Sequence, residues 1–337
     1  MRIFSGIQPT GQKHLGNYIG AIQQYVEGQQ RAADAGDVAI FCVVDLHAMT
    51  VPFDPADMRS RVYDTAAILL AAGLDPERCI FIRQSDVPEH TELAWHLGAV
   101  CSHGDLNRMT QFKEKSGAQR ELVSADLFFY PVLMAADVLA YRADEVPVGD
   151  DQRQHVELMR ELAVRFNAKF GDGTLVAPDI RTPAVGARIM DLQNPEKKMS
   201  TTNGTPEGTV YVLDDEAATL KKFKRAVTDS EDPPRIVRDK GKPGVTNLID
   251  ILAVARGVSP DAIEQEMQSA RGYGDLKVAT AEAVNEMLAP VRERYTAIRA
   301  DEAGLEAVFA AGAAKARAIT TEVLADVRAG IGVGVPR

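Results

Sequence analysis

Cysteine is scarce in this chain of 337 residues. Its three cysteines, Cys42, Cys79 and Cys101, lie among apolar residues, and no two of them have the CxxC spacing of a metal-binding or redox motif. Small buried thiols of this kind are typical of proteins in a reducing compartment. We therefore expect neither a disulfide framework nor a cysteine-bound metal ion.

Long hydrophobic runs are also absent. The most apolar window, residues 66–74, is far shorter than the roughly 18 residues that cross a bilayer. The N-terminus enters a strand pattern at once and lacks the basic and then apolar segments of a secretory signal. With an ordinary hydrophobic fraction of 45%, the sequence predicts a soluble, cytoplasmic protein with a substantial core and no membrane partner.

An excess of positive charge is the third feature that the sequence lacks. Aspartate and glutamate number 48 against 38 lysines and arginines, which gives a net charge of −10. Non-specific binding of nucleic acid needs broad neutralisation of phosphates, and this balance disfavours it. A nucleic-acid partner can still bind through a local patch, for which residues 221–225 and 235–242 are candidates. Both segments could equally be ordinary solvated surface.

The order of apolar patterns predicts the fold class. Strand-like runs at residues 3–7, 38–45, 79–83 and 145–148 alternate with helical patterns near 55–72, 91–101, 124–142 and 150–167. This order is typical of an α/β protein with a doubly wound, mostly parallel sheet. After residue 214 only helical patterns follow, near 214–226, 245–256, 258–269, 275–299 and 302–328. The length fits two domains, the second of them all-α.

Two separated segments carry the chemistry. Residues 9–17 read PTGQKHLGN between the first apolar run and a helical pattern, and this strand–turn–helix arrangement presents backbone N–H groups to phosphates. Gly11 and Gly16 permit close approach, and Thr10 and His14 are donors that can stabilise charge on phosphate oxygens. About 180 residues later, residues 197–204 read KKMSTTNG, in a segment between the two predicted domains.

Together these segments resemble the HIGH and KMSKS motifs of class I aminoacyl-tRNA synthetases. The form FSGIQPTG at residues 4–11 is similar to the start of bacterial tryptophanyl-tRNA synthetases. The resemblance implies a Rossmann-like catalytic domain at 1–192, a KMSKS-type loop at 193–208 and a helical anticodon-recognition domain at 209–337. The last helix of that domain could pack back on the catalytic domain.

The activity that the resemblance implies has two steps. Tryptophan is activated with ATP to tryptophanyl-adenylate and pyrophosphate, and the acyl group then passes to the 2′-hydroxyl of the terminal adenosine of tRNA. ATP, Mg²⁺ bound with ATP rather than by the protein, tryptophan and the tRNA for tryptophan are the implied ligands. Members of the family act as homodimers.

The resemblance also implies the ATP site. Residues with catalytic roles would be Thr10, His14, Lys113, Lys115, Lys198 and Ser200. The ATP contacts would be Gln8, Pro9, Thr10, Gly16, Asn17, Gly149, Asp150, Asp151, Ile189, Lys198, Met199, Ser200, Thr201 and Thr202. Gly149, Asp150 and Asp151 would hold the ribose, and Ile189 would lie at the adenine. The chain departs from the family at Thr201, where a second lysine is usual; Lys113 and Lys115 could partly compensate.

The amino-acid site is expected around Asp137, a single carboxylate inside the apolar segment 130–141. A buried carboxylate needs a partner, which could be a neighbouring backbone group or Arg142. The resemblance implies instead that Asp137 accepts the indole N–H. The other implied residues of this site are Phe4, Gly6, His47, Tyr130, Met134, Val146, Val148 and Gln152, with Tyr130 and Gln152 at the α-ammonium of the substrate. We expect His155 to be structural.

Two other functions remain open on the sequence alone. The chain could be specific for tyrosine, although its start and the Asp137 segment favour tryptophan. It could also be a paralogue kept as a tRNA-binding or regulatory protein, with Thr201 as the mark of lost catalysis.

Overall fold

The computed structural model describes residues 1–110, 124–149, 152–181, 188–201 and 204–334. Five strands form one sheet: β1 (Arg2–Ile7), β2 (Val38–Val43), β3 (Ile80–Arg83), β4 (Glu145–Pro147) and β5 (Asp179–Arg181). Their order is β3-β2-β1-β4-β5, and every pairing is parallel. The predicted doubly wound, Rossmann-like sheet is confirmed.

The edge strand β5 has no counterpart among the predicted strands. It has three residues, of which the first and the last are exposed, and it pairs with β4 through Val146 and Ile180. So short a strand with exposed ends leaves no apolar run in the sequence, and its existence depends on the neighbouring strand.

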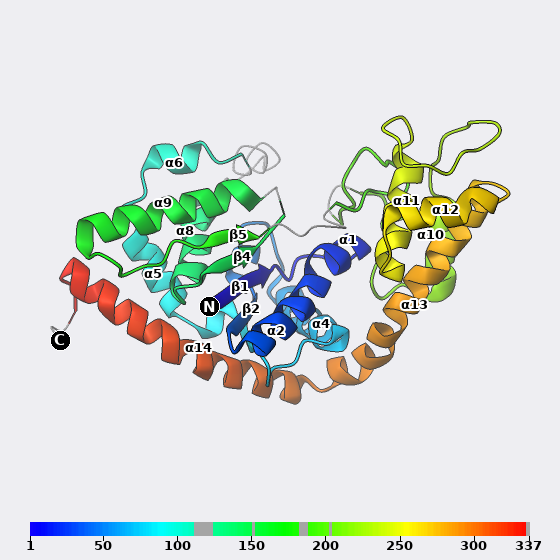
Figure 1. Ribbon diagram of the computed structural model, residues 1–337. Coiled ribbons are helices and arrows are strands. Elements are labelled where there is room, and N and C mark those ends of the chain that lie inside the picture. Colours follow the sequence, from blue (N-terminus) through cyan, green and yellow to red (C-terminus); the bar gives the residue numbers. More distant parts are fainter. Residues whose placement is uncertain (111–123, 150–151, 182–187, 202–203, 335–337) are drawn as a thin grey trace.

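Helices cover both faces of the sheet (Figure 1). In β2, Phe41 and Val43 belong to a buried cluster with α2 (Gln23–Ala35) and α4 (Pro55–Ala72). The alternate residues Ile40 and Cys42 belong to a second cluster with α5 (Glu89–Leu97), α8 (Ala125–Leu139) and α9 (Arg153–Phe170). Because successive side chains of a strand point to opposite faces, a strand buried on both sides is apolar throughout.

Shorter elements complete the first part of the chain: α1 (Leu15–Asn17), the π-helix η1 (Tyr18–Ile22), α3 (Asp45–Ala48), the 3₁₀-helix η2 (Gln84–Asp86) and α6 (His103–Asn107). The second part is helical: α10 (Glu216–Lys224), α11 (Pro243–Arg256), α12 (Pro260–Glu266), the 3₁₀-helix η4 (Met267–Ser269), α13 (Tyr273–Ala300) and α14 (Glu302–Ile331). None of the helices in the described residues combines the length and apolar character of a membrane span.

Helix α14 returns from the helical part and runs beneath the sheet, against β3 and α5 (Figure 1). At Gly312 the approach is so close that a Cβ atom would lie 1.8 Å from the carbonyl oxygen of Phe81, so only glycine fits there. Two ion pairs fasten the same helix to the sheet part, Glu306 with Arg83 at 2.7 Å and Arg328 with Glu92 at 2.6 Å.

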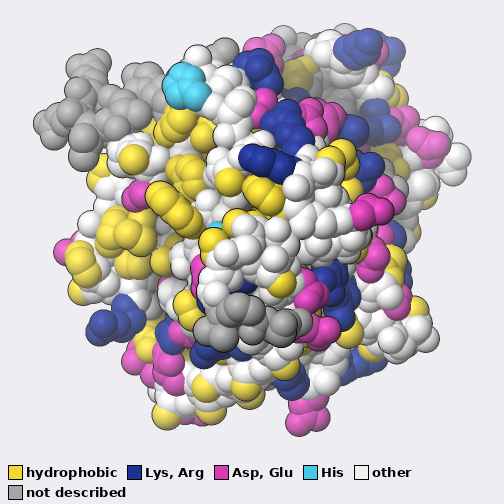
Figure 2. Space-filling model, turned by 90° about the vertical axis from the view of Figure 1, so that its left-hand side faces the viewer, with side chains coloured by type: hydrophobic (Ala, Val, Ile, Leu, Met, Phe, Trp, Pro, Cys, Tyr) yellow, Lys and Arg dark blue, Asp and Glu magenta, His cyan; other side chains and the backbone are white. Residues whose placement is uncertain are grey.

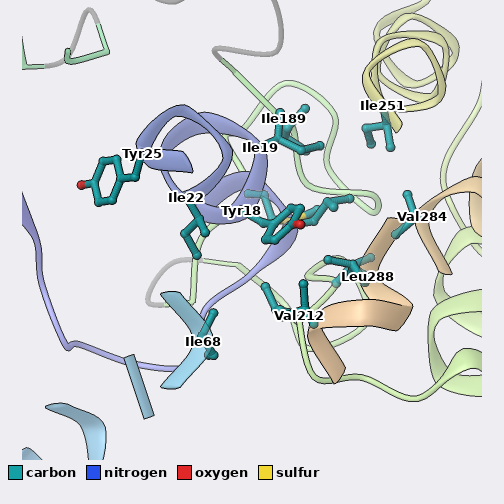
Figure 3. Close-up of a cluster of buried hydrophobic side chains, with 14 of the residues drawn as sticks. Tyr18, Ile19, Ile22, Tyr25, Ile68, Ile189, Val212, Ile251, Val284 and Leu288 are labelled. Carbon is teal, nitrogen blue, oxygen red and sulfur yellow. The ribbon is translucent and has the colours of Figure 1, made fainter. Parts of the chain in front are cut away.

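One hydrophobic cluster crosses from the sheet to the helical part. Figure 3 shows Tyr18, Ile19 and Ile22 of η1 beside Ile189 and Val212, with Ile251 of α11 and Val284 and Leu288 of α13 beyond them. All of these side chains are buried. The helical part is therefore packed against the turn that follows β1, where the sequence places the phosphate site.

Candidate active site

The turn predicted to bind phosphates follows β1 directly and ends in α1. Nδ1 of His14 accepts the backbone N–H of Asn17 at 3.3 Å, and Oδ1 of Asn17 accepts the N–H of His14 at 3.1 Å. This reciprocal cap satisfies two donors at the start of the helix. The chain then continues through η1 into α2. His14 is thus held at the start of the helix by reciprocal hydrogen bonds with Asn17.

The hydrogen bond to Nδ1 also determines where His14 carries its proton. Burial, together with the charges of Lys13 and Lys198, lowers the pKa of His14 from 6.5 to about 4. The ring is therefore neutral at physiological pH. Since Nδ1 accepts a hydrogen bond, the proton is on Nε2, and His14 can offer one N–H donor to an anion.

The KMSKS-like segment is anchored as a narrow two-stranded ladder. The N–H of Met199 donates to the carbonyl of Ile189 at 2.9 Å, and the N–H of Asp191 donates to that of Lys197 at 2.8 Å. Asn247 of α11 fastens the same ladder, because its side-chain amide exchanges two hydrogen bonds with the backbone of Met190. Met199 is buried while Lys198 is exposed. The ladder therefore leaves Lys198 exposed to solvent and buries the side chain of Met199.

The structure brings the two motifs together. A Cβ atom on Gly11 would lie 3.2 Å from Oγ1 of Thr201, and one on Gly16 would lie 3.6 Å from Ile189. Backbone hydrogen bonds join the turn to the residues after the loop, from Leu15 to Val210 at 2.8 Å and from Val212 to Lys13 at 2.9 Å. Thr201, which stands where the family has a lysine, thus packs on the turn itself.

Asp137 lies in a buried polar cluster at the carboxyl edge of the sheet. Its Oδ2 is 2.8 Å from Nε2 of His47, which follows β2. The amide of Gln84, which follows β3, donates to both carboxylate oxygens at 2.8 and 2.9 Å. Nδ1 of His90 lies 3.2 Å from Oδ1 without hydrogen-bond alignment. Burial lowers the pKa of His90.

Arg142 is not the partner of Asp137. Its guanidinium binds the carbonyl of Thr174 at 2.9 Å and Asp326 of α14 at 2.7 Å. The alternative in which Arg142 neutralises Asp137 is therefore wrong. The carboxylate is held by the side chains of Gln84 and His47, which follow two neighbouring strands, and a carboxylate oxygen can accept further hydrogen bonds.

Other predicted residues of the amino-acid site surround this cluster. Phe4 of β1 is buried and stacks on Tyr141, with ring centroids 5.5 Å apart, and Tyr141 bonds His90 at 2.8 Å. The Tyr130 ring meets that of His47 edge-on at 6.2 Å. The hydroxyl of Tyr130 is 2.7 Å from Nε2 of His155.

The remaining predicted residues of the amino-acid site lie on β1 and α8, in and directly after β4, and at the start of α9. Gly6 pairs with Cys42 in β2, and a Cβ atom there would lie 2.9 Å from Val44. Met134 of α8 is partly buried, three residues before Asp137. Val146 is buried in β4. The backbone N–H of Val148 donates to the carbonyl of Arg181 in the neighbouring strand β5. Gln152, at the start of α9, donates its N–H to the carbonyl of Gly149 at 3.0 Å.

A family model described as tRNA synthetases class I (W and Y) matches residues 1–289. The chain belongs to this family. The turn, the loop and the Asp137 cluster of this class I synthetase all lie within the matched residues.

Similar proteins cover nearly the whole chain. It is 48% identical over 320 residues to tryptophan–tRNA ligase 1 of Streptomyces avermitilis, with 94% of each chain covered. It is 44% identical to the tryptophan–tRNA ligase of Wolinella succinogenes, with 98% of each covered. The structure of tryptophanyl-tRNA synthetase from Mycoplasma pneumoniae matches with a TM-score of 0.90 and 35% identity, covering 99% of this chain and 98% of that one.

A solved structure with ligands is also similar. Tryptophanyl-tRNA synthetase from Campylobacter jejuni, in complex with ADP and tryptophan, matches with a TM-score of 0.81 and 32% identity. The match covers 99% of this synthetase and all of that chain. Tyrosyl-tRNA synthetase from Archaeoglobus fulgidus is 20% identical with a TM-score of 0.68, which shows a shared fold.

Some predicted residues of this synthetase lie outside the described residues. These are Lys113, Lys115, Asp150, Asp151 and Thr202. Their roles at the phosphates and the ribose stay predictions.

Several site residues escaped the sequence analysis. Gln84 and His90 both approach Asp137, and Lys13 lies inside the turn that is predicted to bind phosphates. Gln84 had one usable signal, because it directly follows a predicted strand, at the edge where open α/β sheets bind ligands. Nothing in the sequence indicates that Lys13 is buried, because a lysine in a polar turn is ordinarily exposed.

The lowered pKa of His14 predicts a pH-dependent loss of stability. In the unfolded chain this imidazole binds protons near pH 6.5, whereas in the folded protein it does so only near pH 4. The unfolded state thus binds more protons in this window, and the free energy of unfolding should fall as pH drops through it, by at most about 3 kcal/mol. The substitution His14→Asn keeps a side-chain acceptor for the helix cap. It should remove the contribution of His14 to the pH dependence of the free energy of unfolding.

Urea unfolding at pH 7.5, 5.5 and 4.5 measures the effect in both proteins. The stability difference between wild type and His14→Asn should change steadily as the pH falls, with wild type losing more. An identical pH dependence of the two unfolding free energies would show that His14 protonates normally in the folded state.

Proposed function

We propose that this synthetase is a tryptophan–tRNA ligase that activates tryptophan with ATP and charges its tRNA in the cytoplasm. The observation that carries the proposal is the joining of the phosphate-binding turn and the KMSKS-like loop at one edge of the sheet, beside a buried carboxylate. The similarity to tryptophan–tRNA ligases over nearly the whole chain supports the same conclusion.

The first step is attack of the tryptophan carboxylate on the α-phosphorus of ATP. One carboxylate oxygen forms the new P–O bond, the bond from the α-phosphorus to the bridging oxygen breaks, and pyrophosphate leaves. Mg²⁺ enters bound to the phosphates as part of the substrate. No side chain acts as nucleophile, so positioning and electrostatic stabilisation account for the rate.

The residues of the turn and the loop supply that stabilisation. The Nε2–H of His14, the hydroxyl of Thr10 and the ammonium of Lys198 are donors for charge that moves onto the departing pyrophosphate. Thr201 packs against Gly11 and takes the place of a second cation. In the second step the 2′-hydroxyl of the tRNA adenosine attacks the acyl carbon, the bond from that carbon to the phosphate oxygen breaks, and AMP leaves with the hydroxyl proton passing to solvent.

Asp137 is proposed to recognise the indole N–H. Both of its oxygens accept hydrogen bonds from the Gln84 amide, and Oδ2 also contacts Nε2 of His47. The orientation of the Gln84 amide is determined independently, because its Oε1 accepts the N–H of Leu46 at 3.1 Å. An acceptor held in this way selects a ring that carries a donor over one that does not.

Pyrophosphate–ATP exchange with each amino acid tests the proposal. We expect exchange with tryptophan and little with tyrosine or phenylalanine. Exchange with tyrosine alone would support the tyrosine-specific alternative. Absence of exchange with any amino acid, together with tRNA binding, would support a non-catalytic paralogue.

Asp137→Ala should remove most of the selectivity of the enzyme for tryptophan over phenylalanine, which a built hydrogen-bond site can raise to about 10⁴-fold. ATP binding should persist, because the turn and the loop are unchanged. Exchange kinetics with both amino acids measure the ratio of kcat/KM. Asp137→Asn keeps one acceptor oxygen and should retain part of the selectivity, and wild-type selectivity in Asp137→Ala would refute the assignment.

Several basic residues of segments 221–225 and 235–242 form ion pairs within the protein, which leaves fewer of them available to bind tRNA. Lys222 binds Asp214 at 2.6 Å and the carbonyl of Thr209 at 2.8 Å, so it fastens α10 to the segment after the loop. In the second segment, Arg235 pairs with Glu231, Arg238 with Asp250, and Lys242 with both Asp229 and Glu231. Lys221, Lys224, Arg225 and Lys240 are the exposed basic residues of the two segments for which no ion pair is described, and we propose that Lys221 and Lys224 of α10 contact tRNA.

Reversing the charge of Lys221 and Lys224 to Glu should weaken tRNA charging while adenylate formation stays near wild type. The slope of log affinity against log salt should fall by about one for each tRNA phosphate that the variant no longer neutralises. Aminoacylation and pyrophosphate exchange at several salt concentrations measure both. Lys222→Met is the contrasting variant and should lower both steps, whereas equal loss of both steps in the double variant would place these lysines in the fold instead.

We propose further that the enzyme is a homodimer. Trp95 of α5 is 78% exposed, and α8 beside it carries the partly buried Phe129 and Leu133. Figure 2 shows hydrophobic side chains gathered on the face at this end of the molecule. An exposed hydrophobic patch with an aromatic residue is typical of a protein interface.

Trp95→Glu should convert the dimer to monomers, because a dimer with twofold symmetry would bury two such charges in its interface. Sedimentation velocity at micromolar concentration measures the mass. Val258→Glu, at an exposed apolar residue of the helical part, is the control and should leave the mass unchanged. If Trp95→Glu sediments like wild type, the interface lies elsewhere.

A further inference from the structure

Lys13 is a buried lysine inside the phosphate-binding turn. The residue is 5% exposed, whereas Gln12 beside it is exposed. The ammonium donates to the carbonyl of Gln8 at 2.7 Å and, more weakly, to that of Thr10 at 3.4 Å. A buried ammonium is costly unless it gains compensating interactions, and here the compensation comes from two turn carbonyls.

The charges around Lys13 do not neutralise it. Within the described part of the chain no carboxylate forms an ion pair with its ammonium. Arg61 of α4 repels it, and the nearby Asp64 is already bonded to Arg299 at 2.5 Å. Burial is the main cause that lowers the pKa of Lys13 from 10.5 to about 8, where it is still largely protonated at neutral pH. Asp64 favours the charged form of Lys13 from a distance, but the ammonium has no ion-pair partner in the described part of the chain.

The two carbonyl contacts determine how the turn presents its N–H groups. A peptide group is planar, and in the trans form its N–H points opposite to its carbonyl. The Thr10 carbonyl faces the ammonium, so the N–H of Gly11 points away from it. Among the described residues that N–H has no hydrogen-bond partner. Gly11 has a φ of +61°, a left-handed conformation that favours glycine and occurs in anion-binding backbone turns.

We propose that Lys13 is a positioning residue for the ATP phosphates. It holds the carbonyls of Gln8 and Thr10 inward, which leaves the N–H of Gly11 for a phosphate oxygen, and it places a positive charge behind the turn. It acts through the backbone and does not contact the substrate. The inference rests on the proposed ATP-dependent function, in which the triphosphate would supply further negative charge close to the ammonium.

Lys13→Met tests the inference, because methionine has a similar length but neither charge nor donor. We expect the dissociation constant for ATP, measured by calorimetry without tryptophan, to rise about tenfold, the effect of losing hydrogen bonds from a charged donor. The KM for tryptophan in exchange should stay near wild type. The midpoint of thermal unfolding should stay or rise, because an apolar side chain replaces a buried charge.

Two further variants complete the design. Lys315→Met removes a lysine that donates to the carbonyl of Pro76 at 3.0 Å on the exposed side of α14, and it should change none of these quantities. Lys13→Arg keeps the charge and should hold ATP within about threefold of wild type. A purely structural lysine would instead give lower thermal stability in Lys13→Met with the constants for ATP and tryptophan worsened together.

The outcomes also separate this inference from the proposed function. If wild type binds ATP but Lys13→Met binds it equally well, or if Lys13→Arg loses as much affinity as Lys13→Met, the role of Lys13 is refuted. If wild type shows no exchange with tryptophan, the proposed function fails, while the ATP titration still reports on Lys13.

Discussion

Backbone hydrogen bonds between the turn after β1 and the segment after the KMSKS-like loop hold this site together. The N–H of Leu15 reaches the carbonyl of Val210, and the N–H of Val212 reaches that of Lys13. These bonds join segments that are far apart in the chain. This pairing brings the turn and the segment that carries the exposed Lys198 side by side, as the proposed phosphate site requires.

The pairing is stable because a hydrophobic cluster lies beneath it. Tyr18 and Ile19 follow the turn, Ile189 precedes the loop, and all three are buried against the helical part (Figure 3). The helical part is in turn held to the sheet by α14, which passes within contact of β3 at Gly312. The position of the loop thus depends on packing in both parts of the molecule, and a change in α11 or α13 would reach the proposed phosphate site through these contacts.

Asp137 and Lys13 are two buried side chains of opposite charge, and each lies near a proposed ligand-binding site. Asp137 is contacted by the side chains of His47 and Gln84, and under the proposed function it accepts a substrate N–H. The ammonium of Lys13 donates hydrogen bonds to carbonyl oxygens and forms no ion pair within the described residues, close to the place where an anion is expected. In each case the protein stabilises the group without cancelling the property that a ligand would use.

Much of this architecture could be predicted from the amino-acid sequence, because it depends on local patterns. The apolar runs of β1 to β4, the Pro55 and Gly73 boundaries of α4 and the helices after residue 214 are visible in residue order and periodicity. The two motifs could be recognised for the same reason, since their residues are contiguous. The family follows from those motifs and from the match over residues 1–289.

Other features were decided by the tertiary structure. β5 exists only as a partner of β4, and Arg142, which is close to Asp137 in sequence, binds Asp326 of α14 instead. Gln84 reaches Asp137 because parallel strands end at one edge of the sheet, and Lys13 is buried because a distant segment covers its turn. Sequence patterns report which residues follow one another, whereas partners and burial depend on which distant segments the fold brings into contact.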